Sequence, residues 1–205
     1  MASDVEICNR ALSILGEARI ISLADNNKGA RAMNARFTIL RDAELEAHAW
    51  RFAVKRTTLA ASVDVPPWGY TKIYDRPTDD LRPLRVGDTP INALTVGVQY
   101  EASGYVSDGL YEIVEGRIQT NLSAPLNYEY IARVTDTGLF SALFVEALAA
   151  RLAADAAEEI TQSNTKQQAA VNQYKKALSE ARRVNALHTP PTRRGLSRWM
   201  QARYL

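Results

Sequence analysis

The sequence is poor in the side chains that most often carry out chemistry. Its 205 residues include one cysteine and two histidines. The single cysteine, Cys8, excludes an internal disulfide and suits a protein that folds in a reducing cytosol. No C-x-x-C or H-x-x-x-H spacing occurs, so the sequence predicts no zinc or other soft-metal site.

Motifs for nucleotide binding and nucleophilic catalysis are also missing. The ten glycines are scattered, with no phosphate-binding loop and no dinucleotide fingerprint, and neither histidine has a neighbouring G-x-S-x-G signature. The adjacent acids Asp79-Asp80 and Glu158-Glu159 should point apart on a strand or a helix, so we expect them to be solvated or salt-bridged. We therefore expect no catalytic residue, no cofactor and no metal, and a protein that is not an enzyme.

Long apolar runs are absent too. No run approaches the roughly 18 residues that span a bilayer, and the first residues lack the basic and apolar regions of a signal peptide. With 46% apolar and 23% charged residues, the composition is that of an ordinary globular protein. The length fits one domain, or a domain with an inserted subdomain.

The small net charge of +2 hides an uneven distribution. Residues 161–205 carry nine Lys or Arg against one acid, Glu180, a net charge of +8, whereas residues 1–160 carry 16 basic against 22 acidic residues, a net charge of −6. An acidic body with a basic end suggests complementary charge against an acidic partner or against other copies of the chain.

The N-terminal pattern predicts a helix over Ser3–Leu15. Ser3 and Glu6 match a capping box, and Gly16 stands where a left-handed C-terminal cap belongs. Cys8 lies on the apolar stripe, so we expect a core residue and not a nucleophile.

A second, longer helix is predicted over Lys28–Trp50. His48 falls at its end, where an imidazolium would suit the negative helix terminus, and we expect this lone histidine to be a cap or packing residue and not a catalyst. Trp50 and Phe52 are expected to anchor the helix exit in the core.

Between residues 51 and 134 the period changes to that of short strands broken by Pro, Gly and Asp. Glu115-Gly116 predicts a tight hairpin. The predicted strands are Tyr70–Tyr74, Val98–Glu101, Leu110–Val114, Arg117–Asn121 and Tyr128–Val134.

Two further helices are predicted over Thr137–Thr161, capped by Asp136 or Thr137, and over Asn164–Leu187. The first is apolar almost all round in its opening turns, which predicts burial on several sides; its apolar residues are Leu139, Phe140, Leu143, Phe144, Val145, Ala147, Leu148 and Leu152. The second is one-sided, with an apolar stripe of Val171, Tyr174, Leu178 and Ala181 at helical spacing. The fold class predicted is therefore α+β: a helical bundle of residues 1–50 and 136–187, a small antiparallel sheet inserted at 51–135, and an extended C-terminal arm at 188–205.

Pro190-Pro191 ends the last helix, and the residues beyond it alternate arginine with large apolar groups. Trp, Tyr and Arg most often dominate interface energy. We predict that the arm docks on another molecule through Arg193, Arg194, Leu196, Arg198, Trp199, Met200, Arg203, Tyr204 and Leu205. The same composition leaves open a basic-tailed nucleic-acid-binding protein, in which arginines contact phosphates and aromatic rings stack on bases.

Four segments taken in order carry a resemblance. They are ICNRALSILG (7–16), AWRFA (49–53), YEYIARVTD (128–136) and, over 140–154, F-x-x-x-F-x-x-ALAARLAA. This order and spacing resembles the head-to-tail connector proteins of tailed double-stranded DNA bacteriophages, of the tail tubular protein A or adaptor type.

The resemblance implies a structural virion protein, made in the host cytoplasm, without a membrane anchor. It implies a ring of this chain, typically of 12 copies, whose bundle forms the wall of a channel through which double-stranded DNA passes without sequence-specific binding. The β-rich insertion would meet the next tail (nozzle or tube) protein, and the arm would dock into the portal. A cell-wall-degrading tail enzyme is a third class, which the lack of convergent acids or nucleophiles disfavours.

Overall fold

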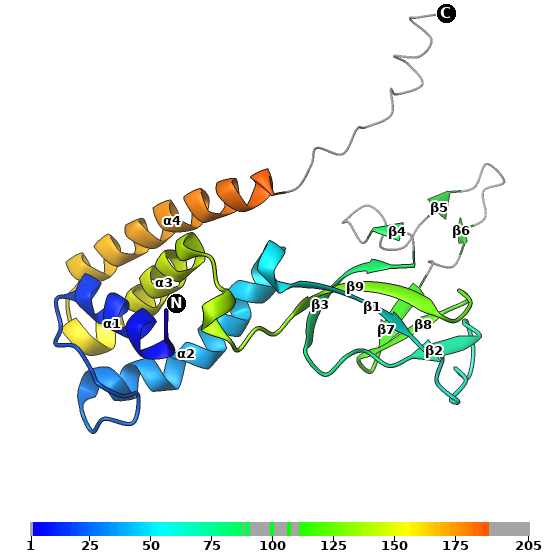
Figure 1. Cartoon of the computed structure of the whole chain (residues 1–205), viewed down its shortest axis with the longest axis horizontal. Helices are drawn as coiled ribbons and strands as arrows, with labels where there is room; N and C mark the ends of the chain where they lie inside the picture. Colours follow the sequence, from blue (N-terminus) through cyan, green and yellow to red (C-terminus); the bar gives the residue numbers. More distant parts are fainter. Residues whose placement is uncertain (1, 88, 91–98, 101–105, 108–110, 189–205) are drawn as a thin grey trace, which may run out of the picture.

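The computed structural model describes residues 2–87, 89–90, 99–100, 106–107 and 111–188. It confirms an α+β fold. The described residues contain four α-helices. Figure 1 shows the helices at one end of an elongated molecule and the sheets at the other, with the ends of β1 and β9 leading from one to the other. The predicted arm lies outside the described residues apart from His188.

The first helix, α1 (Asp4–Leu15), confirms the predicted caps. The Ser3 amide donates to Glu6 Oε2 at 2.7 Å, and the Glu6 amide donates to Ser3 Oγ at 3.2 Å. Gly16 takes the left-handed conformation (φ 75°) and donates to carbonyls of the last turn, which satisfies groups that a helix end leaves open.

The second helix, α2 (Lys28–Ala47), ends three residues before the predicted Trp50. It is capped at its start by Asn27, and it ends because His48 adopts an extended backbone (φ −143°). A 3₁₀ turn, η1 (Arg51–Ala53), then leads into the first strand.

The third helix, α3 (Ala142–Thr161), begins later than predicted. Asp136 caps a separate 3₁₀ turn, η2 (Thr137–Leu139), whereas Ser141 caps the helix itself. Leu139 is 58% exposed and therefore lies outside the buried face that the sequence predicted for it. The fourth helix, α4 (Asn164–Leu187), has the predicted bounds.

The other three helices all pack against α3. Six of its buried residues are alanines, whose small side chains let neighbouring helices approach closely: Ala147, Ala149, Ala150, Ala153, Ala156 and Ala157. Trp50 is 1% exposed and packs edge-on against Phe144 at 4.9 Å between ring centroids. Trp50 and Phe52 are thus the anchors that the sequence predicted.

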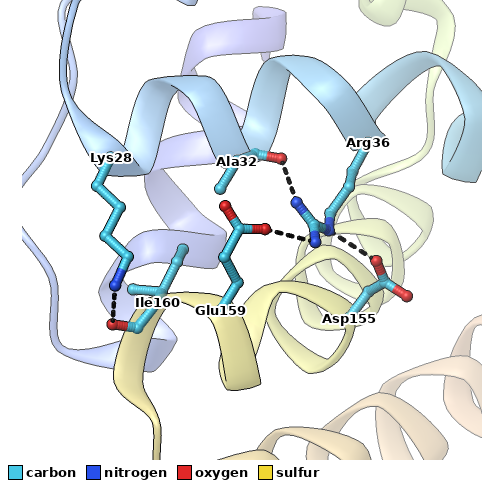
Figure 2. Close-up of polar contacts among 6 residues, drawn as sticks. All are labelled: Lys28, Ala32, Arg36, Asp155, Glu159 and Ile160. Atoms are coloured by element: carbon cyan, nitrogen blue, oxygen red, sulfur yellow. Dashed lines mark hydrogen bonds and ion pairs between the residues drawn. The ribbon is translucent and has the colours of Figure 1, made fainter.

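Polar contacts clamp α2 along α3 (Figure 2). Arg36 contacts Asp155 at 2.8 Å and Glu159 at 2.6 Å, and the Lys28 ammonium donates to the Ile160 carbonyl at 3.1 Å. Glu158, the neighbour of Glu159, is exposed, so this acidic pair is solvated at one residue and salt-bridged at the other, as expected.

The strands form three antiparallel sheets. The first has the order β1-β9-β3-β4, with β1 at Val54–Leu59, β9 at Leu126–Ala132, β3 at Asp80–Val86 and β4 at Thr89–Pro90. The second has the order β2-β8-β7, with β2 at Lys72–Tyr74, β8 at Arg117–Thr120 and β7 at Tyr111–Val114. The third pairs β5 (Gln99–Tyr100) with β6 (Val106–Ser107).

The predicted hairpin joins β7 to β8, and both of its turn residues have positive φ, 52° at Glu115 and 77° at Gly116. This is the backbone of a two-residue turn that matches strand twist. Strands β1, β3, β4 and β6 were not among the predicted ones. The register of β3 against β9 shifts at Pro83, which cannot donate a ladder hydrogen bond.

Candidate functional site: two surfaces and the junction between them

All nine predicted docking residues, from Arg193 to Leu205, lie outside the described residues. What the structure does place is the root of the arm, the last turn of α4. Asn185 accepts from the Arg51 amide at 2.9 Å and donates to the Ala49 carbonyl at 3.0 Å. Since residues 49–51 lead directly into β1, the arm starts at the junction between the helices and the sheets.

His48 completes this junction. It is the C-cap residue of α2 and packs edge-on against Trp50, which agrees with the predicted cap or packing role, but its ring is not the imidazolium that would suit the helix end. The Asn185 oxygen accepts from Arg51, so the amide nitrogen faces His48 Nε2 at 3.1 Å, and this ring nitrogen must act as the acceptor. Burial and the nearby cations Arg182 and Arg82 lower the pKa of His48. The ring is held neutral, and it does not serve as an imidazolium at the end of α2.

Near the last turn of α2, a buried carboxylate contacts side chains of α3 and α4. The side chain of Glu44, on α2, is fully buried, and its Oε2 accepts from Arg151 on α3 and, at 2.9 Å, from the Tyr174 hydroxyl on α4. Burial and the hydrogen bond to Glu44 raise the pKa of Tyr174 to about 12. The sequence predicted Tyr174 as part of an apolar stripe. It did not indicate that Glu44 is buried, because a glutamate side chain on a helix normally faces water.

The Asp79-Asp80 pair is salt-bridged, as expected, but its geometry differs from the prediction. Asp79 contacts Lys55 at 2.6 Å and accepts from the Tyr130 hydroxyl at 3.0 Å; Asp80 contacts Arg76 at 2.7 Å and accepts from the Tyr128 hydroxyl.

The two tyrosine rings are stacked, 5.4 Å apart, so the two carboxylates lie on the same side of β9. The alternation rule fails here because Asp79 precedes β3 and the register shifts directly after Asp80. Burial and the hydrogen bond to Asp79 raise the pKa of Tyr130 to about 12, and the hydrogen bond to Lys55 lowers the pKa of Asp79. Both acids are thus engaged in fastening β3 to β9.

Cys8 is fully buried in the bundle. Burial, with a smaller contribution from Asp4, raises the pKa of its thiol to about 12. A thiol that stays protonated and covered is a poor nucleophile, which agrees with the predicted core role. No group of three or more His, Cys, Asp or Glu in the described part of the chain could hold a metal ion.

The first candidate surface is the outer face of α4. Lys175 and Lys176 recur seven residues later as Arg182 and Arg183, which places the four cations on one side of the helix. All four are exposed, and none forms an ion pair with another described residue. We call these four residues the basic face.

The second candidate surface lies on the second sheet and on the loop before it. Cross-strand pairing places Ile73, Gln119 and Glu112 in one row, with Arg117 and Val114 in the next row on the same face. The loop adds Val63, Val65 and Trp68, which are 97%, 70% and 80% exposed. A cavity of about 390 Å³ lies between loop and sheet, lined by Pro67, Trp68, Ile73, Glu112, Val114, Glu115, Arg117 and Gln119. We call the cavity with the three exposed loop residues the Trp68 surface.

Comparison of the sequence with models of known protein families and with curated proteins gives no match. None of the helices in the described part of the chain combines the length and the apolarity that a bilayer span requires.

Proposed function

We propose that the protein is a structural component of a phage virion, an adaptor ring that joins the portal to the tail and forms part of the channel through which DNA leaves the capsid. The proposal rests on the resemblance of four ordered segments and on the placement of the contact regions. In this reading the helical bundle packs side by side with other copies, and the arm reaches the portal. The sheet end meets the next tail protein.

The observation that carries the proposal is the spatial separation of these regions. The Trp68 surface lies on the sheets, at the opposite end of the molecule from the helices (Figure 1). The arm leaves from the junction between the two, where Asn185 is bound to residues 49 and 51. A chain with a packing body, an arm and a separate apolar surface can bind three different neighbours at once.

The direct test is electron microscopy of the purified protein mixed with portal. The expected result is a closed ring seated on the portal, with a central hole. Particles that show single copies scattered on the portal, without a ring, would contradict the proposal.

The arm is tested by deleting residues 190–205. Residues 190–205 lie outside the described helices and sheets, so we expect a folded protein with an unchanged circular dichroism spectrum and loss of portal binding. The matched control is Lys175→Ser with Lys176→Ser, which alters charge near the arm and keeps the arm itself. Retained portal binding after the deletion would remove the arm from the proposal.

A second candidate function, nucleic-acid binding, is favoured by the basic face of α4. Cations without acidic partners are free to contact phosphates, and such binding weakens steeply as salt rises because counterions are released. The adaptor proposal predicts weak binding to free double-stranded DNA, because a conduit must not hold what passes through it. Tight binding with a steep salt dependence, abolished by reversing the four charges, would favour the second function.

A further inference from the structure

The Trp68 surface is held in place although it is largely exposed. Arg117 on β8 contacts Asp64 at 2.7 Å and Asp75 at 2.9 Å, which ties the loop to the second sheet. The Ser62 amide donates to the Ile73 carbonyl at 2.8 Å, and Pro66 is buried. A fixed loop that keeps a tryptophan 80% exposed is typical of an interaction site, because exposed apolar surface is costly in water.

The charge around this surface is negative. Asp64, Asp75, Glu112 and Glu115 stand against the single cation Arg117, which gives a net charge of −3. An occupant that matches both properties must combine positive charge with large apolar side chains.

The chain contains one segment of that chemistry. Residues 189–205 include four arginines and no acid, together with Leu196, Trp199, Met200, Tyr204 and Leu205. The cavity of about 390 Å³ is at the lower end of the range of ligand-binding pockets, a size suited to one large side chain with its flanking backbone. Apolar contact with Trp68 and ion pairs with Glu112 and Glu115 would act together.

The segment also starts within reach of the surface. Its root is bound to residues 49 and 51, and the six residues of β1 lead from there toward the second sheet over about 20 Å. The Ala61–Tyr74 bridge then joins the chain after β1 to β2, at the edge of the Trp68 surface. The 17 residues 189–205 span about 55 Å when extended, which exceeds this path.

We propose that in the free protein residues 189–205 dock in cis on the Trp68 surface of the same chain. The inference does not depend on the adaptor role.

The test is a distance measurement by pulsed electron paramagnetic resonance on the full chain, with spin labels at Ala61→Cys and Ser197→Cys. Ala61 is exposed and lies at the edge of the Trp68 surface without being part of it, and Cys8 is buried and stays unlabelled. The expected result is a short, narrow distance distribution, unchanged when the labelled chain is mixed with a large excess of unlabelled protein.

The charge reversal Glu112→Lys with Glu115→Lys is expected to broaden and lengthen that distribution, as is Trp68→Ala. The matched control is Glu17→Lys with Glu158→Lys, two exposed acids on the helical bundle that form no ion pair with a described residue, and it should change nothing. A broad distribution in the unmodified protein overturns the inference, and so does a distribution that ignores the reversal at Glu112 and Glu115. Loss of the short distance on mixing would show docking on a second copy and overturn the cis arrangement. None of these outcomes bears on ring formation with the portal, which is measured separately.

Discussion

The helical end and the sheet end of this molecule are stabilised in different ways. In the bundle, the other three helices pack against α3 mainly through apolar side chains, and the buried Glu44 carboxylate adds a polar network. In the sheets, the link between β3 and β9 is made by two tyrosines that donate to two aspartates. Both ends expose large apolar side chains. At the helical end these residues are far apart in the sequence, at Ile21, Ile39, Leu139 and Leu187, whereas at the sheet end Val63, Val65 and Trp68 lie on one loop. The sheet end therefore collects its most exposed apolar residues on a single segment.

The largest expected effect on the free energy of unfolding is that of replacing the buried tryptophan, Trp50, and it is compared with the exposed Trp68. Trp50→Ala removes a side chain that is 1% exposed, packs against Phe144 and donates to the Glu44 carbonyl at 2.8 Å. We expect it to lower the free energy of unfolding by about 3–5 kcal/mol, the usual cost of truncating a buried aromatic residue. Urea denaturation followed by circular dichroism measures this.

Its control is Trp68→Ala, which removes a side chain of the same size that is 80% exposed. The free energy of unfolding should then change by no more than about 0.5 kcal/mol. A loss comparable to that of Trp50→Ala would show that Trp68 supports the fold and would end the distinction between the two ends.

An intermediate effect is expected in the sheets. Tyr128→Phe leaves the fully buried Asp80 with one acceptor bond fewer, and an unsatisfied buried group costs about 1–3 kcal/mol. Tyr130→Phe should cost less, because the Asp79 side chain is 32% exposed and water can replace the lost donor. Equal losses in denaturation of the two variants would mean that solvent access does not decide the strength of these bonds.

The smallest expected effect on stability is the pH dependence contributed by His48 at the junction. Its pKa is lower in the folded protein than its usual value of about 6.5, so the unfolded chain binds a proton first as the pH falls. The contribution of the neutral ring is therefore fully present above about pH 6.5 and is lost as the pH falls toward the folded pKa. Unfolding midpoints measured between neutral and mildly acidic pH should fall less steeply for His48→Gln than for the unmodified protein. An unchanged slope in His48→Gln would show that His48 does not contribute to this pH dependence.

The helices could be predicted because their signals are local. The capping box at Ser3, the cap at Gly16 and the stripe of α4 each lie within one or two turns of sequence, and the predicted helices correspond to those observed. The errors fall at the ends that tertiary contacts decide. His48 turns out of α2 to bind Asn185, which lies 137 residues away, and no local pattern could show this.

The sheet end was harder to predict because its stabilising pairs are distant in sequence. Strand β1 reads as polar, and its pairing with β9 joins residues more than 60 positions apart. The same holds for Glu44, whose two partners are 107 and 130 residues away. Of the candidate sites, the composition of the arm was evident in the sequence, but the Trp68 surface was not, because its acids and apolar groups come together only through the register of β2, β8 and β7.

The two hydrogen bonds of the Asn185 side chain determine how a pull on the C-terminal segment is transmitted through the molecule. The Asn185 side chain binds both the Ala49 carbonyl and the Arg51 amide. A pull on the C-terminal segment therefore acts on α4 through the chain itself and on the base of β1 through this pair of hydrogen bonds. Tension applied at one end of the molecule would reach the root of the sheets without first unwinding a helix. The junction is therefore a point of load transfer, and its stiffness would determine whether an event at the arm is transmitted to the sheet end.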